Sequence, residues 1–249
     1  HLAKVNINWW YNENDKLSFV FGRQLNKRKE FDVRRNAEKP IIDLDLITTD
    51  LMIDWDHSFS ENSDGLIGLH FFNQDNDNNP GTGTTPYIPN YNTNRYSFFL
   101  IENLKFGNKQ FEIGIRVDNE DYNVRGREVS QKIFRDEHSL TNTTFSVGFE
   151  NKLSERFSFR TNLGSAWRTP NMAELYSFGS HGFKNSFGFL RYYYNENNKL
   201  RTDKVIIMSE SLLSPEKSLK LINELNYKSE KNEIKLTLFS NYIMNYVFQ

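Results

Sequence analysis

The sequence predicts an all-β fold made of about ten long antiparallel strands. Three observations predict it: apolar and polar residues alternate along many segments, short and long connections follow one another in turn, and no long run has the spacing of an amphipathic helix. Alternation with a period of two places apolar side chains on one face of a strand and polar side chains on the other.

The composition excludes several classes of protein. The 249 residues carry a net charge of -1 and contain no cysteine. Balanced charge gives no chain-wide basic surface for nucleic acid, and the lack of cysteine excludes a disulfide scaffold, a thiolate metal site and a cysteine nucleophile. Aromatic residues make up 15% of the chain, which argues against disorder. No apolar run is long enough for a transmembrane helix.

The alternation is clearest at 110–118, where Phe111, Ile113, Ile115 and Val117 are separated by polar residues and one glycine. The same pattern recurs along the chain, with apolar positions at Val5, Ile7 and Trp9; Leu17, Phe19 and Phe21; Leu51, Ile53 and Trp55; Phe145, Val147 and Phe149; Phe157, Phe159 and Leu163; Leu219, Leu221 and Leu225; and Ile234, Leu236 and Leu238. The segment 96–106 is aromatic, with less distinct faces. Strands are therefore expected over residues 2–11, 16–24, 44–58, 65–74, 95–106, 109–122, 139–153, 156–168, 217–229 and 232–248.

The connections between these strands alternate in length. Short turns are expected at 12–15, 61–64, 107–108, 154–155 and 230–231, and long polar connections at about 25–43, 75–94, 123–138 and 168–216. Short turns at one end and long loops at the other are typical of a transmembrane β-barrel of the bacterial outer membrane, with the long loops outside the cell. A soluble β-sandwich also alternates, but a connection as long as 168–216 is uncommon in a compact domain.

The direction of the strands bears on completeness. The first and last expected strands would both place a chain end on the outer side, whereas a complete bacterial barrel has both ends on the periplasmic side. We therefore expect residues 1–249 to be one partial barrel domain that lacks strands at both ends. Unpaired strand edges are costly in lipid, so this piece alone is not expected to form a stable barrel.

Two boxes flank the longest connection. The first runs from Trp167 to Tyr176 and contains Pro170, which ends a strand, and Asn171, which with Glu174 three residues later could cap a short helix. The second box runs from Leu213 to Ser218. Both boxes, together with the strand Gly114–Asp118 and the strand Asn241–Val247, carry a resemblance to a known family.

The sequence resembles the barrel of a TonB-dependent outer-membrane receptor. The matching motif residues are Trp167, Arg168, Pro170, Glu174, Leu175, Tyr176, Pro215 and Glu216. The resemblance implies a 22-stranded barrel around a plug, in the outer membrane of a Gram-negative bacterium, in contact with lipid. It also implies a transporter and not an enzyme, with no intrinsic cofactor and no nucleic-acid partner. The implied activity is import of a scarce nutrient, with energy from the TonB complex through an N-terminal region outside this sequence.

The ligand implied is a ferric siderophore, haem or a metal ion, bound by the outer loops together with the plug, and in this sequence the longest connection supplies the loop candidates. The candidate ligand-binding residues there are His181, Tyr176, Phe183, Arg191, Tyr192, Tyr193 and Tyr194. An imidazole can ligate haem iron axially, so His181 is a candidate haem ligand, and the aromatic residues could stack on a porphyrin. With a single histidine in this connection, a zinc site is short of ligands unless other loops contribute them. The plainer interpretation of His181 is a solvated loop residue.

Two other functions remain open at this stage. A passive porin or adhesin would share the barrel, and the presence or absence of a plug would separate it from a transporter. An outer-membrane hydrolase would use an Asp and a His, for which Asp54 and His57 are the candidates.

Overall fold

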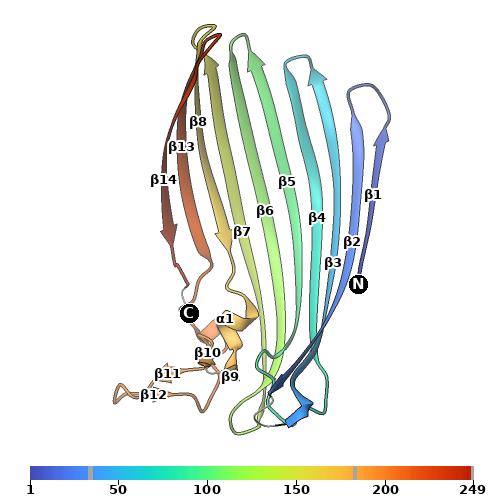
Figure 1. The fold of residues 1–249 in the computed structure, drawn as a ribbon, viewed down its shortest axis with the longest axis vertical. Helices are drawn as coiled ribbons and strands as arrows, with labels where there is room; N and C mark the ends of the chain where they lie inside the picture. The colour runs from blue at the N-terminus through green and yellow to red at the C-terminus, as the bar shows by residue number, and fades with distance from the viewer. Residues whose placement is uncertain (33–35, 182–183, 248–249) are drawn as a thin grey trace.

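The computed structural model describes residues 1–32, 36–181 and 184–247, and within them a single ten-stranded antiparallel sheet dominates the fold (Figure 1). Each strand lies beside its neighbours in sequence, in the order β1-β2-β3-β4-β5-β6-β7-β8-β13-β14. The strands are β1 (Leu2–Trp10), β2 (Lys16–Asp32), β3 (Asn36–Ser60), β4 (Ser63–Asn78), β5 (Asn90–Phe106), β6 (Lys109–Arg127), β7 (Ile133–Lys152), β8 (Phe157–Arg168), β13 (Glu216–Lys228) and β14 (Glu233–Met244).

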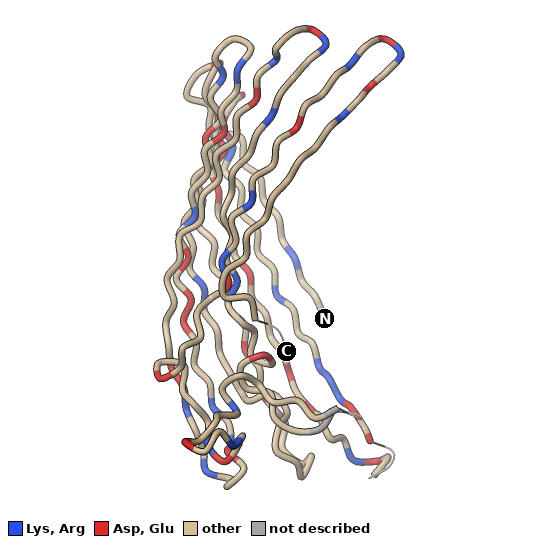
Figure 2. The backbone as a smooth tube through the Cα atoms, turned by 90° about the vertical axis from the view of Figure 1, so that its left-hand side faces the viewer, with Lys and Arg blue, Asp and Glu red and all other residues tan. Residues whose placement is uncertain are grey.

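The sheet is bowed like a trough and does not close on itself, because β1 and β14 form its two edges (Figure 2). The remaining elements all lie between β8 and β13, at the end of the sheet opposite the short hairpin turns (Figure 1). They are α1 (Met172–Tyr176), β9 (Phe178–His181), β10 (Lys184–Phe187), β11 (Tyr193–Tyr194), β12 (Leu200–Arg201) and the 3-10 helix η1 (Met208–Glu210). No helix in the described ranges has the length and apolar character to span a membrane.

The two faces of the sheet differ as the alternation predicts. Along β6, Ile113 and Ile115 are exposed on one face, which we call the apolar face, while Asp118 and Glu120 are buried on the other. We call this second face the covered face, because the long connection lies against it. The row of paired residues through Ile115 continues the apolar face on neighbouring strands, as Trp9, Leu17, Trp55, Ile67, Leu100 and Phe145.

Several strands run further than the hydrophobic pattern indicates. β2 and β3 continue through most of the expected connection 25–43, and β6 and β7 leave only residues 128–132 of the expected 123–138. The extension of β2 and β3 is held by cross-strand ion pairs, Lys27 with Asp45 at 3.2 Å and Lys29 with Asp43 at 3.1 Å. These segments pair through the backbone although apolar residues do not alternate regularly along them, since Ile41 and Ile42 are adjacent, so a hydrophobic alternation cannot reveal them.

The other two long connections are close to expectation. The segment between β4 and β5 covers residues 79–89, and the segment between β8 and β13 covers residues 169–215. Both lie at the same end of the sheet, so the candidate functional residues of the long connection are brought beside the loop 79–89 (Figure 1). A backbone hydrogen bond from Phe178 to Tyr87 joins the two directly, at 3.0 Å.

Candidate functional site

The long connection begins with a capped helical turn. Pro170 and Asn171 end β8, and the Asn171 side chain accepts a hydrogen bond from the Glu174 backbone at 2.9 Å. The Glu174 carboxylate in turn accepts from the Asn171 backbone at 2.8 Å, which completes a capping box. The five-residue helix α1 therefore starts where the spacing of Asn171 and Glu174 predicts.

Arg168 joins the two ends of the connection. Its guanidinium donates two hydrogen bonds to Glu216, at 2.8 and 2.9 Å, and a third to Glu174, at 2.8 Å. Glu216 is the residue paired with Arg168 across β8 and β13. Planar bidentate pairing of this kind is the strongest form of side-chain ion pair. The two sequence boxes thus meet at one arginine, and we call these three residues the Arg168 clasp.

Trp167 attaches the start of the connection to the covered face of the sheet. Its indole N–H donates to Asp118 at 2.9 Å. Asp118 is 2% exposed and also accepts from Ser97 at 2.6 Å and from Arg116 at 2.8 Å. The strand motif that contains Arg116 and Asp118 therefore contacts the first box directly.

A second contact with the covered face lies two residues further along the chain, at Thr169. Thr169 donates to the buried carboxylate of Glu120 at 2.8 Å, and Arg95 pairs with the same carboxylate at 2.8 Å. The Arg95 guanidinium also lies 5.8 Å from the ring centre of Trp167. These contacts satisfy buried charges that would otherwise be costly, and they fix the direction in which the connection leaves β8.

A small core buries the helix against the outer ends of β6 and β7. Leu175 and Tyr176 are fully buried, and the Tyr176 hydroxyl donates to Asp136 at 2.5 Å. The backbone N–H of Met208 donates to the same carboxylate at 2.7 Å, so η1 is held there too. The members of this core are Tyr122, Val124, Phe134, Met172, Leu175, Tyr176, Leu190 and Met208.

Gly188 lets a later part of the connection approach this helix. A Cβ at this position would lie 2.4 Å from the Leu175 carbonyl and 2.5 Å from the Tyr176 nitrogen. Both are backbone atoms, so they cannot swing away. We expect Gly188→Ala to destabilise the packing of the connection by about 1–3 kcal/mol, measured as faster hydrogen exchange of 169–215 in the full-length receptor. Gly22→Ala is the control, because its nearest neighbour would be 3.9 Å away; equal exchange in both variants would contradict the prediction.

Arg191 is a buried cation. Its side chain is only 3% exposed, donates to the backbone carbonyl of Arg127 at 3.1 Å, and lies 4.5 Å from the ring centre of Phe178 and 5.3 Å from that of Phe134. Burial lowers the pKa of Arg191 to about 10, and the negative charge of Glu128 only partly offsets this. Within the described ranges Arg191 forms no ion pair with a carboxylate.

Arg191 and Tyr176 line a cleft of about 460 Å³ between the loop 79–89 and the ends of β6 and β7. Two further arginines, Arg125 and Arg127, lie on its β6 wall. We call this space the cationic cleft. Its other lining residues come mainly from the loop, as Asn78, Asn79, Pro80, Gly81, Thr82, Gly83, Thr84, Pro86, Pro89 and Asn90. Arg125 and Arg127 stand at odd-numbered positions of β6, like the exposed Ile113 and Ile115, so Arg191 is the buried arginine of this cleft. A cation beside a cleft attracts anionic molecules and raises their local concentration.

Three other candidate ligand residues do not line this cleft. Tyr193 and Tyr194 form β11, which pairs with β12, and Tyr192 directly precedes it. The Tyr193 hydroxyl donates to Asp203, and Tyr194 is 61% exposed. None of the three lines the cationic cleft as described.

His181 lies at the end of β9, opposite Lys184 of β10. Phe183 lies outside the described residues. The role of His181 as a haem ligand stays a prediction. Among the residues that the structure describes, no group of three or more His, Asp or Glu side chains is placed to hold a metal ion.

The candidate Asp and His of a hydrolase do not meet. Asp54 and His57 lie an odd number of residues apart on β3, so their side chains leave opposite faces of the sheet. The His57 imidazole instead contacts the Glu102 carboxylate at 2.8 Å. Gly65 lies between them on β4, where a Cβ would come within 2.8 Å of that carboxylate. The Asp/His hydrolase interpretation is therefore wrong.

Comparisons with known proteins agree with this architecture. The family model described as "TonB dependent receptor-like, beta-barrel" matches residues 3–249. A search of the curated proteins finds no match. Among solved structures, the chain is similar to the siderophore receptor PiuA from Acinetobacter baumannii, with 10% identity and a TM-score of 0.63 over 96% of this chain and 39% of that one.

Two further structures are similar. The alcaligin outer membrane receptor FauA from Bordetella pertussis has 12% identity and a TM-score of 0.67, over 97% of this chain and 36% of that one. The copper transporter OprC has 13% identity and a TM-score of 0.63, over 93% of this chain and 36% of that one. The chain thus spans little more than a third of the length of these receptors, and at such low identity the likeness concerns the fold.

The family match covers nearly the whole chain, and the ten-stranded sheet has the fold of the solved receptor barrels. The members of this family are transport receptors and not enzymes. The chain therefore belongs to the family of TonB-dependent receptors and forms an unclosed part of their transmembrane β-barrel.

Proposed function

We propose that this chain is the part of an outer-membrane receptor barrel that gathers an anionic metal chelate, which the whole receptor imports with energy from TonB. Ferric siderophores or haem are the best ligand class. Similar structures include a siderophore receptor, an alcaligin receptor and a copper transporter. The observation that carries the proposal is Arg191, a buried cation that lines the cationic cleft and forms no described ion pair.

The same proposal sets the orientation in the membrane. The apolar face contacts the lipid of a Gram-negative outer membrane, the short turns face the periplasm, and the loop 79–89 and connection 169–215 face outside. The contact with TonB is made by a region beyond this sequence, and the whole barrel has 22 strands. No intrinsic cofactor is proposed, since the metal chelate is cargo.

Uptake by cells tests the proposal as a whole. Cells that express the full-length receptor should accumulate iron-55 supplied as ferric citrate, a ferric catecholate or haemin, and accumulation should stop when TonB is deleted. Uptake that continues without TonB would favour the passive porin or adhesin interpretation instead.

The buried arginine gives a sharper prediction. We expect Arg191→Gln to weaken binding of the accepted chelate at least about tenfold, because a hydrogen bond to a charged group contributes about 1.5–3 kcal/mol. Arg201→Gln is the matched control, since Arg201 lies on the exposed ribbon and pairs with Asp203 at 3.0 Å. Titration of both purified variants measures the effect. Equal affinities would remove the cationic cleft from the binding site.

The haem alternative has its own test. If haemin is the accepted chelate and His181 is an axial ligand, His181→Ala should weaken haemin binding and change the Soret absorption of the complex. An unchanged spectrum and affinity would leave His181 as an ordinary loop residue.

A further inference from the structure

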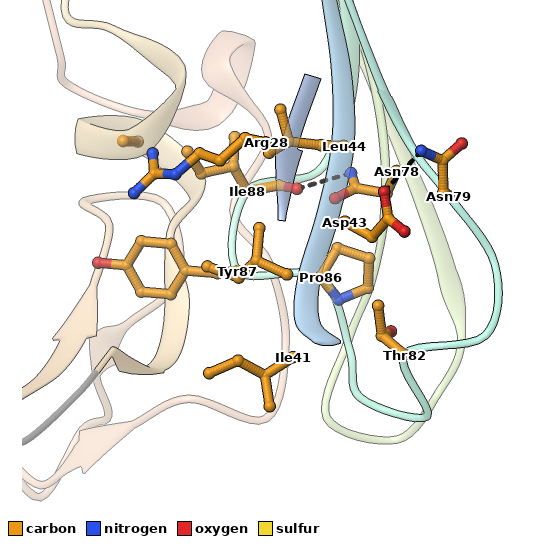
Figure 3. Close-up of a pocket in the computed structure, with 12 residues that line it drawn as sticks. Arg28, Ile41, Asp43, Leu44, Asn78, Asn79, Thr82, Pro86, Tyr87 and Ile88 are labelled. Atoms are coloured by element: carbon orange, nitrogen blue, oxygen red, sulfur yellow. Dashed lines mark hydrogen bonds between the residues drawn. The ribbon is translucent and has the colours of Figure 1, made fainter. Parts of the chain in front are cut away.

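A second pocket lies on the other side of the loop 79–89, against the ends of β2 and β3 (Figure 3). Its volume is about 200 Å³, and Ala173 of α1 lies in its wall. Most of the remaining lining is apolar, from Ile41, Ile42, Leu44, Pro86, Tyr87 and Ile88, with Arg28, Asp43, Asn78, Asn79 and Thr82 at its polar side. We call it the apolar pocket.

The polar groups at the edge of this pocket are already bonded within the protein. Asp43 accepts a hydrogen bond from the Asn79 amide at 2.8 Å, and the Asn78 amide donates to the Ile88 carbonyl at 2.9 Å, as Figure 3 shows. Arg28 pairs with Glu30. Because these polar groups already have hydrogen-bond or ion-pair partners in the protein, they do not need a ligand to satisfy them. A ligand in this pocket would therefore mainly contact its apolar side chains.

The apolar pocket and the cationic cleft share a wall. Asn78, Asn79, Thr82 and Pro86 line both of them. One side of the loop 79–89 therefore faces the cleft that Arg191 lines, and the other faces isoleucine, leucine and proline side chains. A pocket of about 200 Å³ is smaller than the roughly 300–1,000 Å³ of a site that holds a whole drug-sized ligand. It fits one apolar arm of a larger molecule.

We propose that the ligand of this receptor is amphiphilic, with its anionic group in the cationic cleft and a short alkyl or single-ring arm in the apolar pocket. This inference rests on the proposed function, because it names the kind of anionic molecule that the same end of the barrel takes. It also assigns a purpose to the apolar pocket, which a small, purely hydrophilic chelate would leave empty.

Simple anions with a growing tail test the inference without knowledge of the natural ligand. The full-length receptor in lipid nanodiscs is titrated calorimetrically with butane-, hexane- and octane-1-sulfonate, and empty nanodiscs are subtracted. Burial of a methylene contributes a free energy that corresponds to about fourfold in affinity. We expect affinity to rise by about that factor per methylene until the pocket is full.

Filling the pocket should abolish this dependence. Ala173→Trp is expected to give equal affinities for the three sulfonates, below the affinity of the unaltered receptor for the butane compound, and Ala173→Ser is the control with a small side chain that should keep the dependence. Ile41→Trp fills the same pocket from β3, so a failure of α1 to fold in one variant does not decide the result. Chain-length dependence that survives both tryptophan variants would overturn the inference.

The outcome separates this inference from the proposed function. Arg191→Gln should weaken all three sulfonates by the same factor, since it removes only the anion contact. Equal affinities for the three sulfonates, together with Arg191-dependent binding and TonB-dependent uptake, would contradict only the inference that the ligand is amphiphilic. Loss of the Arg191 and TonB effects would sink the proposed function.

Discussion

Tyr176→Ala is expected to release the long connection from the sheet. Tyr176 is fully buried in the small core and donates a hydrogen bond to Asp136. Truncation of a large buried aromatic residue costs about 3–5 kcal/mol, because a cavity remains. Hydrogen exchange over 169–215 in the full-length receptor should rise by several hundredfold, while exchange in β4 and β5 should stay unchanged.

The phenylalanine variant separates packing from hydrogen bonding. Tyr176→Phe keeps the ring but leaves Asp136 with one donor fewer, so we expect a smaller cost of about 1–3 kcal/mol. If Tyr176→Phe and Tyr176→Ala accelerated exchange equally, the ring would contribute nothing and the packing argument would be wrong. If neither variant changed exchange, the connection would not depend on this core.

Arg168→Ala is expected to open the Arg168 clasp. The change removes three hydrogen bonds and leaves Glu174 and Glu216, whose side chains are 18% and 11% exposed, without their cation. A fully buried pair that loses one partner costs about 3–5 kcal/mol, but the Arg168 side chain is 43% exposed, and solvent screens part of the effect. We expect about 2 kcal/mol, seen as easier cleavage of the connection by trypsin.

Two further variants test whether the Arg168 clasp depends on bidentate geometry or on charge alone. Arg168→Lys keeps the charge but cannot form the bidentate contact, so its effect should be intermediate. Arg201→Ala breaks an exposed pair with Asp203 and should cost under about 1 kcal/mol. A lysine variant as well protected as the original would show that charge alone holds the clasp.

The alternation along the sequence predicted the sheet because one face carries exposed apolar side chains and the other carries buried polar ones. Phe111, Ile113, Ile115 and Val117 all lie on the apolar face, and the hairpin turn of β5 and β6 falls at Gly107 and Asn108 as expected. In such a strand every second residue is apolar for a physical reason, so the pattern alone determines strand and face.

The outer ends of β2 and β3 were harder to predict, because backbone pairing and cross-strand ion pairs, and not a regular apolar alternation, mark them. Beyond the apolar face, β2 and β3 are joined by backbone hydrogen bonds and by pairs such as Lys29 with Asp43. Charges of opposite sign on neighbouring strands leave no periodic mark in a single segment. Their complementarity becomes visible only once the register of the two strands is known.

In the candidate site, contacts between residues close in sequence could be predicted, and contacts between distant segments could not. The capping box was predictable because its two residues lie three apart. The strand that contains Asp118 was recognised, but its contact with Trp167 was not, and Asp136, which holds Tyr176, was not found, because each contact joins segments at least 40 residues apart. Nothing in the sequence distinguishes Asp136 from other polar residues at alternating positions. Arg191 was selected as a candidate, but its burial depends on Phe178 of the same connection and on Phe134 of the distant strand β7.

The clasp at Arg168 has a consequence for how such receptors can diversify. Arg168 and Glu216 join the two ends of the long connection, so the chain between them is a closed loop. The entropic cost of closing such a loop grows only with the logarithm of its length. Doubling it would cost only about 0.6 kcal/mol. Changes in length between these two ends are therefore tolerated best outside the residues that pack on the sheet, such as Leu190 and Met208, whose partners on β6 and β7 would have to change with them.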